Sequence, residues 1–361
     1  MAMLVLSFSS AFAGGPAPQF GITTGEIKLG DTYLDNWRVG YHGLIVDGMN
    51  VYSVRGYPEK VGGSVLGIEV VMDQSSDGGL TWQNSVGIAR DPNILGQGSL
   101  IAINPVTKAL HYAWNTYEPL LTPSWNLYYG NGTTTTRVNG SLDVQTYADS
   151  SMAVDGTGVI HFVFTASDTA VYYTSSSDNG VTFSAPAAIP GAFGWSQFTA
   201  DSAGNLYLVD SNNSTNAYFL RKPAGGQWSN PVAVCTNCAR NDPSIAVYDS
   251  NRIYLQWGDI IAATSNGGVN WTVSPVPAGS IWGGILAVSS DGLLNYAFMA
   301  TDGVYFARTT KSFDPTSWGP AVLVFRGAIE PNVAVDSAGK AYIAATKNYS
   351  DNSVIVFTKE K

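Results

Sequence analysis

The chain has 361 residues, of which 45% are hydrophobic, 12% aromatic and 12% charged. This hydrophobic content excludes a chain that stays disordered, because it is sufficient to form a buried core. The formal net charge is -9 and no run of basic residues could neutralise successive phosphates, so we expect no nucleic-acid partner. Helix-forming runs are rare beside 39 Gly, which predicts an all-β protein with many turns.

The first 13 residues, MAMLVLSFSSAFA, form an apolar stretch that ends in Ala-Phe-Ala before Gly14. This pattern predicts a secretory signal peptide over residues 1–13, although no basic residue precedes the apolar run. The run is too short to cross a bilayer and no later stretch is long enough, so we expect no transmembrane segment. The predicted location is secreted, periplasmic or on the cell surface.

Short strand-like segments that end near Asp or Asn recur seven times, from GLIVD at 43–47 to NVAVD at 332–336. Their average spacing is about 48 residues, close to the length of a four-stranded propeller blade. Seven such units nearly fill residues 14–361, which predicts a single seven-bladed β-propeller domain, with six blades as the alternative. The last unit shows three strands. We therefore expect Gly25–Gly30 to pair with Ser353–Lys359 and close the ring, because an open ring would expose strand edges.

A turn formula, Ser-x-Asp-x-Gly-x-Thr-aromatic, appears in full twice and in a weaker copy at 264–271. Its Ser and Asp side chains can hydrogen-bond within the turn, its Gly can adopt positive φ, and its aromatic ring can pack on a neighbouring sheet. We expect structural roles for Ser75, Asp77, Gly79 and Trp82, and for Ser176, Asp178, Gly180 and Phe183.

These turns resemble the Asp-box, or BNR, repeat of sialidase-like β-propellers. The resemblance covers the chain after the leader and implies the propeller fold. It does not imply one activity, because Asp boxes occur in sialidases, other glycosidases, lectins and non-catalytic scaffolds.

The two cysteines, Cys235 and Cys238, stand in Cys-Thr-Asn-Cys. We expect a local disulfide, with two free thiols as the alternative. Ala239 follows where haem attachment would need His, and the three histidines lie far away in the sequence. No metal or cofactor is predicted.

In a propeller the first strand of each blade lines the central channel, so the residues leading into these strands converge at one mouth. Carboxylates and guanidinium groups there could bind sugar hydroxyls, while indole rings could stack on the apolar face of a sugar. The alternative is ordinary turn chemistry, since Asp242 and Glu330 each precede a proline. The predicted ligand-binding residues are Tyr41, Asp149, Trp195, Arg240, Asp242, Trp282, Arg326 and Glu330.

The sequence favours an exported, non-catalytic module that recognises a glycan or an extracellular protein at this mouth. One alternative is a glycosidase that uses Asp242, Glu330 or Asp149 as acid, base or nucleophile. Sialidase chemistry is disfavoured, because Trp37-Arg38-Val39-Gly40 lacks the proline of the family's first arginine motif. A structural subunit of a surface assembly is the third possibility, and the residues leave open whether the protein is an enzyme.

Overall fold

A computed structural model describes residues 19–20, 27–32, 43–61, 64–83, 85–91, 95–118, 124–145, 150–211, 215–238, 243–281, 283–348 and 353–361. All regular elements in these ranges are β-strands, and within them no helix is long and apolar enough to span a membrane. The predicted signal peptide lies outside the described residues.

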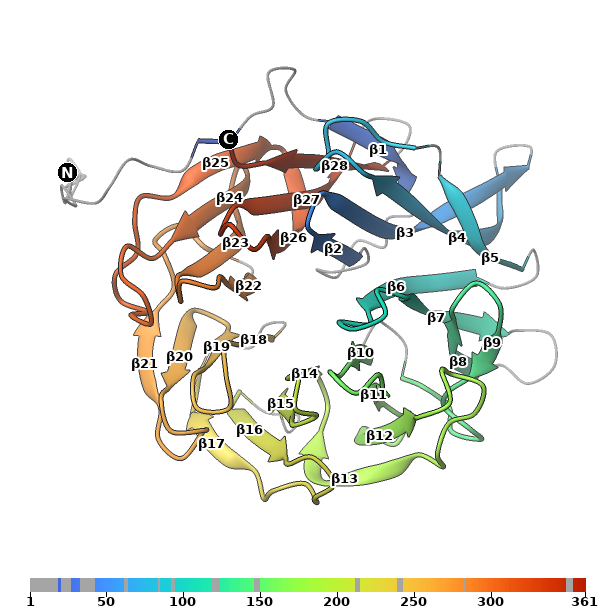
Figure 1. The fold of residues 1–361 in the computed structure, drawn as a ribbon, viewed down its shortest axis with the longest axis horizontal. Helices are drawn as coiled ribbons and strands as arrows, with labels where there is room; N and C mark the ends of the chain where they lie inside the picture. Colours follow the sequence, from blue (N-terminus) through green and yellow to red (C-terminus); the bar gives the residue numbers. More distant parts are fainter. Residues whose placement is uncertain are drawn as a thin grey trace, which may run out of the picture.

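The strands form seven antiparallel four-stranded sheets arranged in a ring, each with one edge strand nearest the centre (Figure 1). The protein is therefore a seven-bladed β-propeller, and the six-bladed alternative is wrong.

Each of the first six blades runs from its inner to its outer strand in chain order. Blade 1 comprises β2 (Gly43–Asp47), β3 (Asn50–Val61), β4 (Ser64–Ser75) and β5 (Val86–Asp91). Blade 2 comprises β6 (Leu95–Ile103), β7 (Leu110–Glu118), β8 (Ser124–Gly130) and β9 (Thr135–Arg137). Blade 3 comprises β10 (Ser150–Val154), β11 (Ile160–Thr165), β12 (Ala170–Ser176) and β13 (Ala187–Phe193).

The later blades follow the same order. Blade 4 comprises β14 (Ser196–Ala200), β15 (Leu206–Asp210), β16 (Ala217–Lys222) and β17 (Val232–Cys235). Blade 5 comprises β18 (Ser244–Val247), β19 (Ile253–Trp257), β20 (Ile260–Thr264) and β21 (Thr272–Pro275). Blade 6 comprises β22 (Gly284–Val288), β23 (Leu294–Ala300), β24 (Gly303–Arg308) and β25 (Val322–Arg326).

Blade 7 is completed by both ends of the chain. Its strands β26 (Ala328–Val335), β27 (Ala341–Asn348) and β28 (Ser353–Lys359) are joined at the outer edge by β1 (Ile27–Thr32), which pairs antiparallel with β28. This confirms the predicted closure by an N-terminal strand, with the strand two residues further along the chain than expected. Phe20 adds a bridge to Glu360.

Among the described residues the core consists of seven hydrophobic clusters, one at each interface between neighbouring blades. Second strands such as β11 and β19 are buried at every position, because each is covered by a blade on both faces. This explains their nearly continuous apolar sequences. Each fully buried aromatic side chain, such as Phe162 or Phe219, contributes about 1.5–3 kcal/mol.

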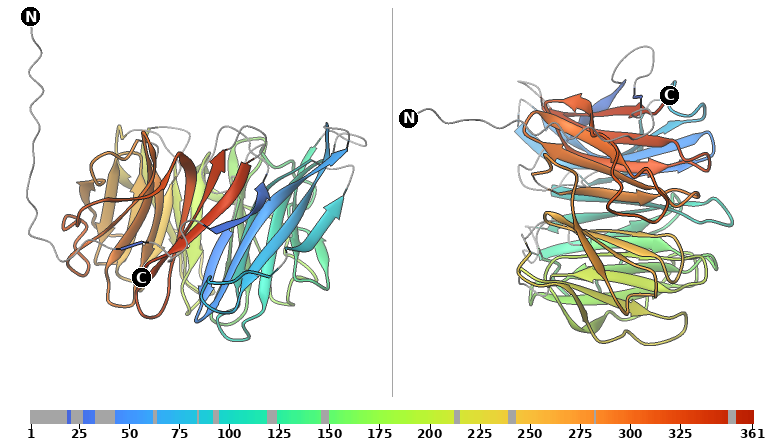
Figure 2. Two further views of the ribbon diagram at one scale, coloured as in Figure 1. Left: turned by 90° about the horizontal axis from the view of Figure 1, so that it is seen from above. Right: turned by 90° about the vertical axis from the view of Figure 1, so that its left-hand side faces the viewer.

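The antiparallel order of each blade defines two faces of the ring, which Figure 2 shows from the side. We call the end at which the inner strands begin the top face and the opposite end the bottom face. Fourth strands run back to the top face, so the connections between blades lie there. The turns between third and fourth strands lie on the bottom face.

Three of these bottom-face turns, 75–82, 176–183 and 264–271, share one hydrogen-bond pattern, and we call them the capped turns. In the second, Gly180 N donates to Ser176 Oγ (2.9 Å) and Thr182 N donates to Asp178 Oδ1 (3.0 Å). The other two turns repeat both bonds, with Asn266 in place of the aspartate in the third. The Thr182 hydrogen bonds lower the pKa of Asp178 to about 2.

Candidate binding site on the top face

The connections that lead into the inner strands carry the predicted site. Trp195, Arg326 and Glu330 belong to the described part of the chain, and the structure places all three on the top face. Five other predicted residues lie outside the described residues: Tyr41, Asp149, Arg240, Asp242 and Trp282.

Trp195 is half-buried and directly precedes β14, the inner strand of blade 4. Its main chain forms a reciprocal pair with Ser211 at the end of the next strand. Trp195 N donates to Ser211 Oγ (3.1 Å), and Ser211 N donates to Trp195 O (3.0 Å). The preceding Gly194 has φ +88, which glycine adopts without strain. The backbone that carries the indole is therefore fixed in one geometry.

Arg326 ends β25 and its side chain is 72% exposed. Its Nη1 lies 3.0 Å from Asp302 Oδ2, while Tyr305 donates its hydroxyl to the other oxygen of Asp302 (2.9 Å). This hydrogen bond to Asp302 raises the pKa of Tyr305. The Arg326 guanidinium is thus paired with the Asp302 carboxylate and still has N–H donors that face solvent.

Glu330 lies within β26, where a bulge interrupts the register between Ile329 and Asn332. Glu330-Pro331 therefore lies inside the strand and not in a turn before it. Glu330 is only 4% exposed and has φ +53, an uncommon and costly conformation for a residue with a side chain. Thr346 donates its hydroxyl to Glu330 Oε2 (3.0 Å).

These three residues occupy two separate places around the ring. Trp195 lies between blades 3 and 4, whereas Arg326 and Glu330 lie where β25 of blade 6 leads into β26 of blade 7. A main-chain bond recurs at both places, from Gly194 N to Thr169 O and from Gly327 N to Asp302 O (both 2.8 Å). The same scaffold therefore carries an indole at one connection and a guanidinium with a buried carboxyl at the other.

Sequence reasoning missed Asp302 and Ser211, which hold Arg326 and Trp195 in place. Both follow second strands of their blades, and those strands end on the top face. Their position relative to the repeat could have identified them. Within the described ranges no group of three or more His, Cys, Asp or Glu side chains could hold a metal ion.

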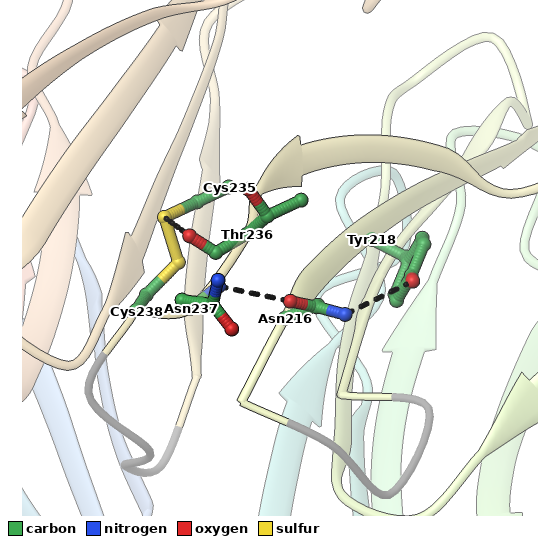
Figure 3. The surroundings of a disulfide bond; sticks show 6 residues. All are labelled: Asn216, Tyr218, Cys235, Thr236, Asn237 and Cys238. Atoms are coloured by element: carbon green, nitrogen blue, oxygen red, sulfur yellow. Dashed lines mark hydrogen bonds between the residues drawn. A yellow bond between two sulfur atoms is a disulfide. The ribbon is translucent and has the colours of Figure 1, made fainter.

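A disulfide bond joins Cys235 and Cys238 at the top end of blade 4 (Figure 3). Between them, Asn237 N donates to Asn216 Oδ1 (2.9 Å), and Asn216 Nδ2 donates to the Tyr218 hydroxyl (3.3 Å). The disulfide therefore constrains the chain where it leaves β17 for blade 5.

Comparisons with known proteins identify the fold alone. No family model and no curated protein sequence matches this chain. Among solved structures, the BP39L lectin from Burkholderia pseudomallei aligns with a TM-score of 0.62 and 10% identity, over 88% of this chain and 95% of the lectin. The NanB sialidase of Streptococcus pneumoniae, as its K499G mutant, aligns with a TM-score of 0.52 and 11% identity, over 93% of this chain and 70% of that one. The fold is sialidase-like.

A third similar structure is the GH93 α-L-arabinofuranosidase of Fusarium graminearum in complex with arabinobiose. It aligns with a TM-score of 0.54 and 10% identity, over 93% of this chain and 97% of that one. A lectin and two glycosidases thus share this sialidase-like propeller, so the fold is compatible with glycan binding and with hydrolysis.

Proposed function

We propose that this protein is an exported sialidase-like propeller that binds a glycan on its top face, with Trp195 as the stacking platform. The observation that carries the proposal is the half-buried indole on a backbone held by the reciprocal Ser211 pair. A rigid aromatic face loses little conformational entropy when a sugar stacks on it. The undescribed Tyr41, Asp149, Arg240, Asp242 and Trp282 remain proposed members of the same site.

A glycan array combined with site variants tests this proposal. Trp195→Ala should weaken binding to the parent's array hits by about 1–3 kcal/mol, the usual range for a binding hot spot. Trp195→Phe should retain most of the affinity because it keeps an aromatic face. Phe193→Ala is the matched control. Phe193 is also an aromatic residue, is 40% exposed, and ends β13, the outer strand of blade 3 that leads to Trp195. Loss of affinity in Phe193→Ala but not in Trp195→Ala would refute the platform.

A protein ligand is the other outcome of this test. No glycan binding by the parent, together with saturable binding of one extracellular protein that Trp195→Ala abolishes, would replace the glycan by that protein.

A second candidate function, glycoside hydrolysis, is favoured by the buried, positive-φ Glu330. The Thr346 hydroxyl holds the Glu330 carboxyl in one position, as a general acid or base requires. Asp242 or Asp149 would then supply the second carboxylate that such chemistry needs. A fluorogenic glycoside panel tests this: Glu330→Gln should abolish turnover of any glycoside that the parent hydrolyses. Unchanged turnover in this nearly isosteric variant would remove Glu330 from the mechanism.

Export is the remaining part of the proposal. The apolar N-terminal segment and the Cys235–Cys238 disulfide support it, because disulfides persist in oxidising compartments. Sequencing the N-terminus of the protein from its native host should find Gly14. An N-terminus at Met1 on protein recovered from the cytoplasm would contradict export.

A further inference from the structure

Four residues at the ends of second strands occupy one column of the repeat. Each of them lies ten residues after the residue that directly follows an inner strand. The pairs are Asp155 and Thr165, Asp201 and Ser211, Ser289 and Met299, and Asp336 and Thr346. Because second strands run towards the top face, this column lies beside the connections that carry the candidate site.

In the connection between blades 3 and 4, two members of the column hold one peptide unit. Thr165 of blade 3 donates its hydroxyl to Gly194 O (2.7 Å), and Trp195 N donates to Ser211 Oγ of blade 4 (3.1 Å). Both hydroxyl-bearing side chains are fully buried. The peptide bond between Gly194 and Trp195 is therefore hydrogen-bonded to blade 3 through its carbonyl oxygen and to blade 4 through its N–H.

The connection between blades 6 and 7 repeats this arrangement around Glu330. Glu330 N donates to Met299 Sδ of blade 6 (3.2 Å), and Thr346 of blade 7 donates its hydroxyl to Glu330 Oε2 (3.0 Å). Again one contact comes from the preceding blade and one from the residue's own blade. The same column thus holds two chemically different candidate ligand-contacting residues.

We propose that this column is a positioning layer for the top-face site, and that Thr165 and Thr346 set the orientation of Trp195 and of the Glu330 carboxyl before ligand binds. This inference rests on the proposed function for its ligand but not for its geometry. Side chains held in place by buried partners bind without first losing conformational freedom. The fastening also links the site to the relative placement of neighbouring blades.

Hydrogen exchange tests the Trp195 part without any ligand. Thr165→Val removes one hydroxyl at nearly constant volume, and should speed exchange of the Trp195 amide at least tenfold, while Thr165→Ser should restore the slow rate. Thr174→Val is the matched control, because Thr174 is a buried blade 3 threonine whose hydroxyl donates to Ser184 O (2.6 Å) on the bottom face. Unchanged exchange at Trp195 in Thr165→Val, or an equal rise in Thr174→Val, would overturn the inference.

Carboxyl footprinting with a carbodiimide and glycine ethyl ester tests the Glu330 part. Labelling of Glu330 in the native parent should be slow, because the residue is 4% exposed. Thr346→Val should raise it several-fold, and Thr346→Ser should return it to the parent rate. Equal labelling of Glu330 in all three proteins would refute a positioning role for Thr346.

A binding measurement separates this inference from the proposed function. Immobilised mucin glycoprotein serves as the probe, and Thr165→Val should weaken parent-level binding about tenfold while Thr174→Val does not. If the parent binds no mucin and no array glycan, the proposed function fails. The positioning layer is then tested by hydrogen exchange at the Trp195 amide alone. If Thr165→Val binds mucin as the parent does, positioning of Trp195 for binding is refuted even where exchange is faster.

Discussion

Gly180 of blade 3 packs against the ring of Tyr129 on blade 2, so closely that a Cβ atom on Gly180 would lie 1.9 Å from Tyr129 Cε1. The first and third capped turns repeat this contact, with Gly79 on Phe357 and Gly268 on Phe219. The aromatic residue that ends each turn meets the same ring; the centroids of Phe183 and Tyr129 are 5.4 Å apart. The three capped turns therefore attach blades 1, 3 and 5 to the blade that precedes each of them around the ring.

Replacing Gly180 by alanine should destabilise the protein by about 2–4 kcal/mol, because overpacking against Tyr129 adds to the strain of φ +81. Urea unfolding measures the change. Gly132→Ala is the control for backbone strain alone, since Gly132 has φ +86 with no atom within 4 Å of the added Cβ. Equal losses in the two variants would show that the contact with Tyr129 carries no cost.

Asp178→Ala should lower the melting temperature by a few degrees and leave ligand affinity unchanged, because Asp178 caps a bottom-face turn. Asp77→Ala should behave alike in the first capped turn. Ser177→Ala, at an exposed position of the same turn, is the control. A loss of affinity without a change in melting temperature would contradict the structural assignment.

Acid should remove the contribution of these caps in a defined range. The Thr182 hydrogen bonds lower the pKa of Asp178 from 3.8 to about 2. A carboxyl with a lowered folded-state pKa stabilises the fold above its unfolded pKa, and this contribution disappears as the pH falls from about 4 to about 2. Thermal scans over this range should show a smaller decline for Asp178→Ala than for the parent.

A separate loss of stability is expected between pH 7 and 5 from two buried histidines. Burial lowers the pKa of His111 and of His161, although His161 Nε2 lies 3.1 Å from Asp155 Oδ2. Below about pH 6.5 the two imidazoles bind protons in the unfolded chain more readily than in the fold, so the free energy of unfolding decreases. Each histidine should therefore make the protein measurably less stable at pH 5.5 than at pH 7.5.

Urea unfolding at pH 7.5 and 5.5 measures this effect. His111→Asn with His161→Asn should make the two free energies of unfolding more nearly equal. Asparagine is a reasonable replacement, because Asn295 occupies the same repeat position in blade 6 and is fully buried. A pH dependence as steep as that of the parent would exclude both histidines as its source.

Phe20→Ala should lower stability by about 1–3 kcal/mol, because its half-buried ring packs edge-on against Phe306 (4.9 Å between centroids) in the cluster between blades 6 and 7. Gln19→Ala is the control: Gln19 is exposed, and its carbonyl oxygen, which accepts a hydrogen bond from Lys361 N (2.9 Å), is retained. Equal stabilities of these two variants would show that Phe20 does not help to close the ring.

The repeat in the sequence was sufficient to predict seven blades and the N-terminal closing strand, because a spacing of about 48 residues leaves each unit room for four short strands. The capped turns were also legible, since the hydrogen bonds of Ser176 and Asp178 join residues within eight positions of each other. Hydrogen bonds between residues that are close in the chain can be predicted from the local sequence.

The candidate site depends on contacts between strands of the same blade and of neighbouring blades, which no local pattern encodes. Trp195 stood out by residue type, but the hydroxyls of Thr165 and Ser211 that hold its peptide come from β11 and the end of β15 on two different blades. Glu330 was predicted to bind ligand, with ordinary turn chemistry as the alternative, and the pairing of β26 with β27 places it in a bulge, where its buried carboxyl accepts a hydrogen bond from Thr346. Tertiary structure decided these points. The pairing of strands within a blade and the packing of one blade on the next together determine which strand ends meet, and these contacts fix the orientation and burial of each side chain.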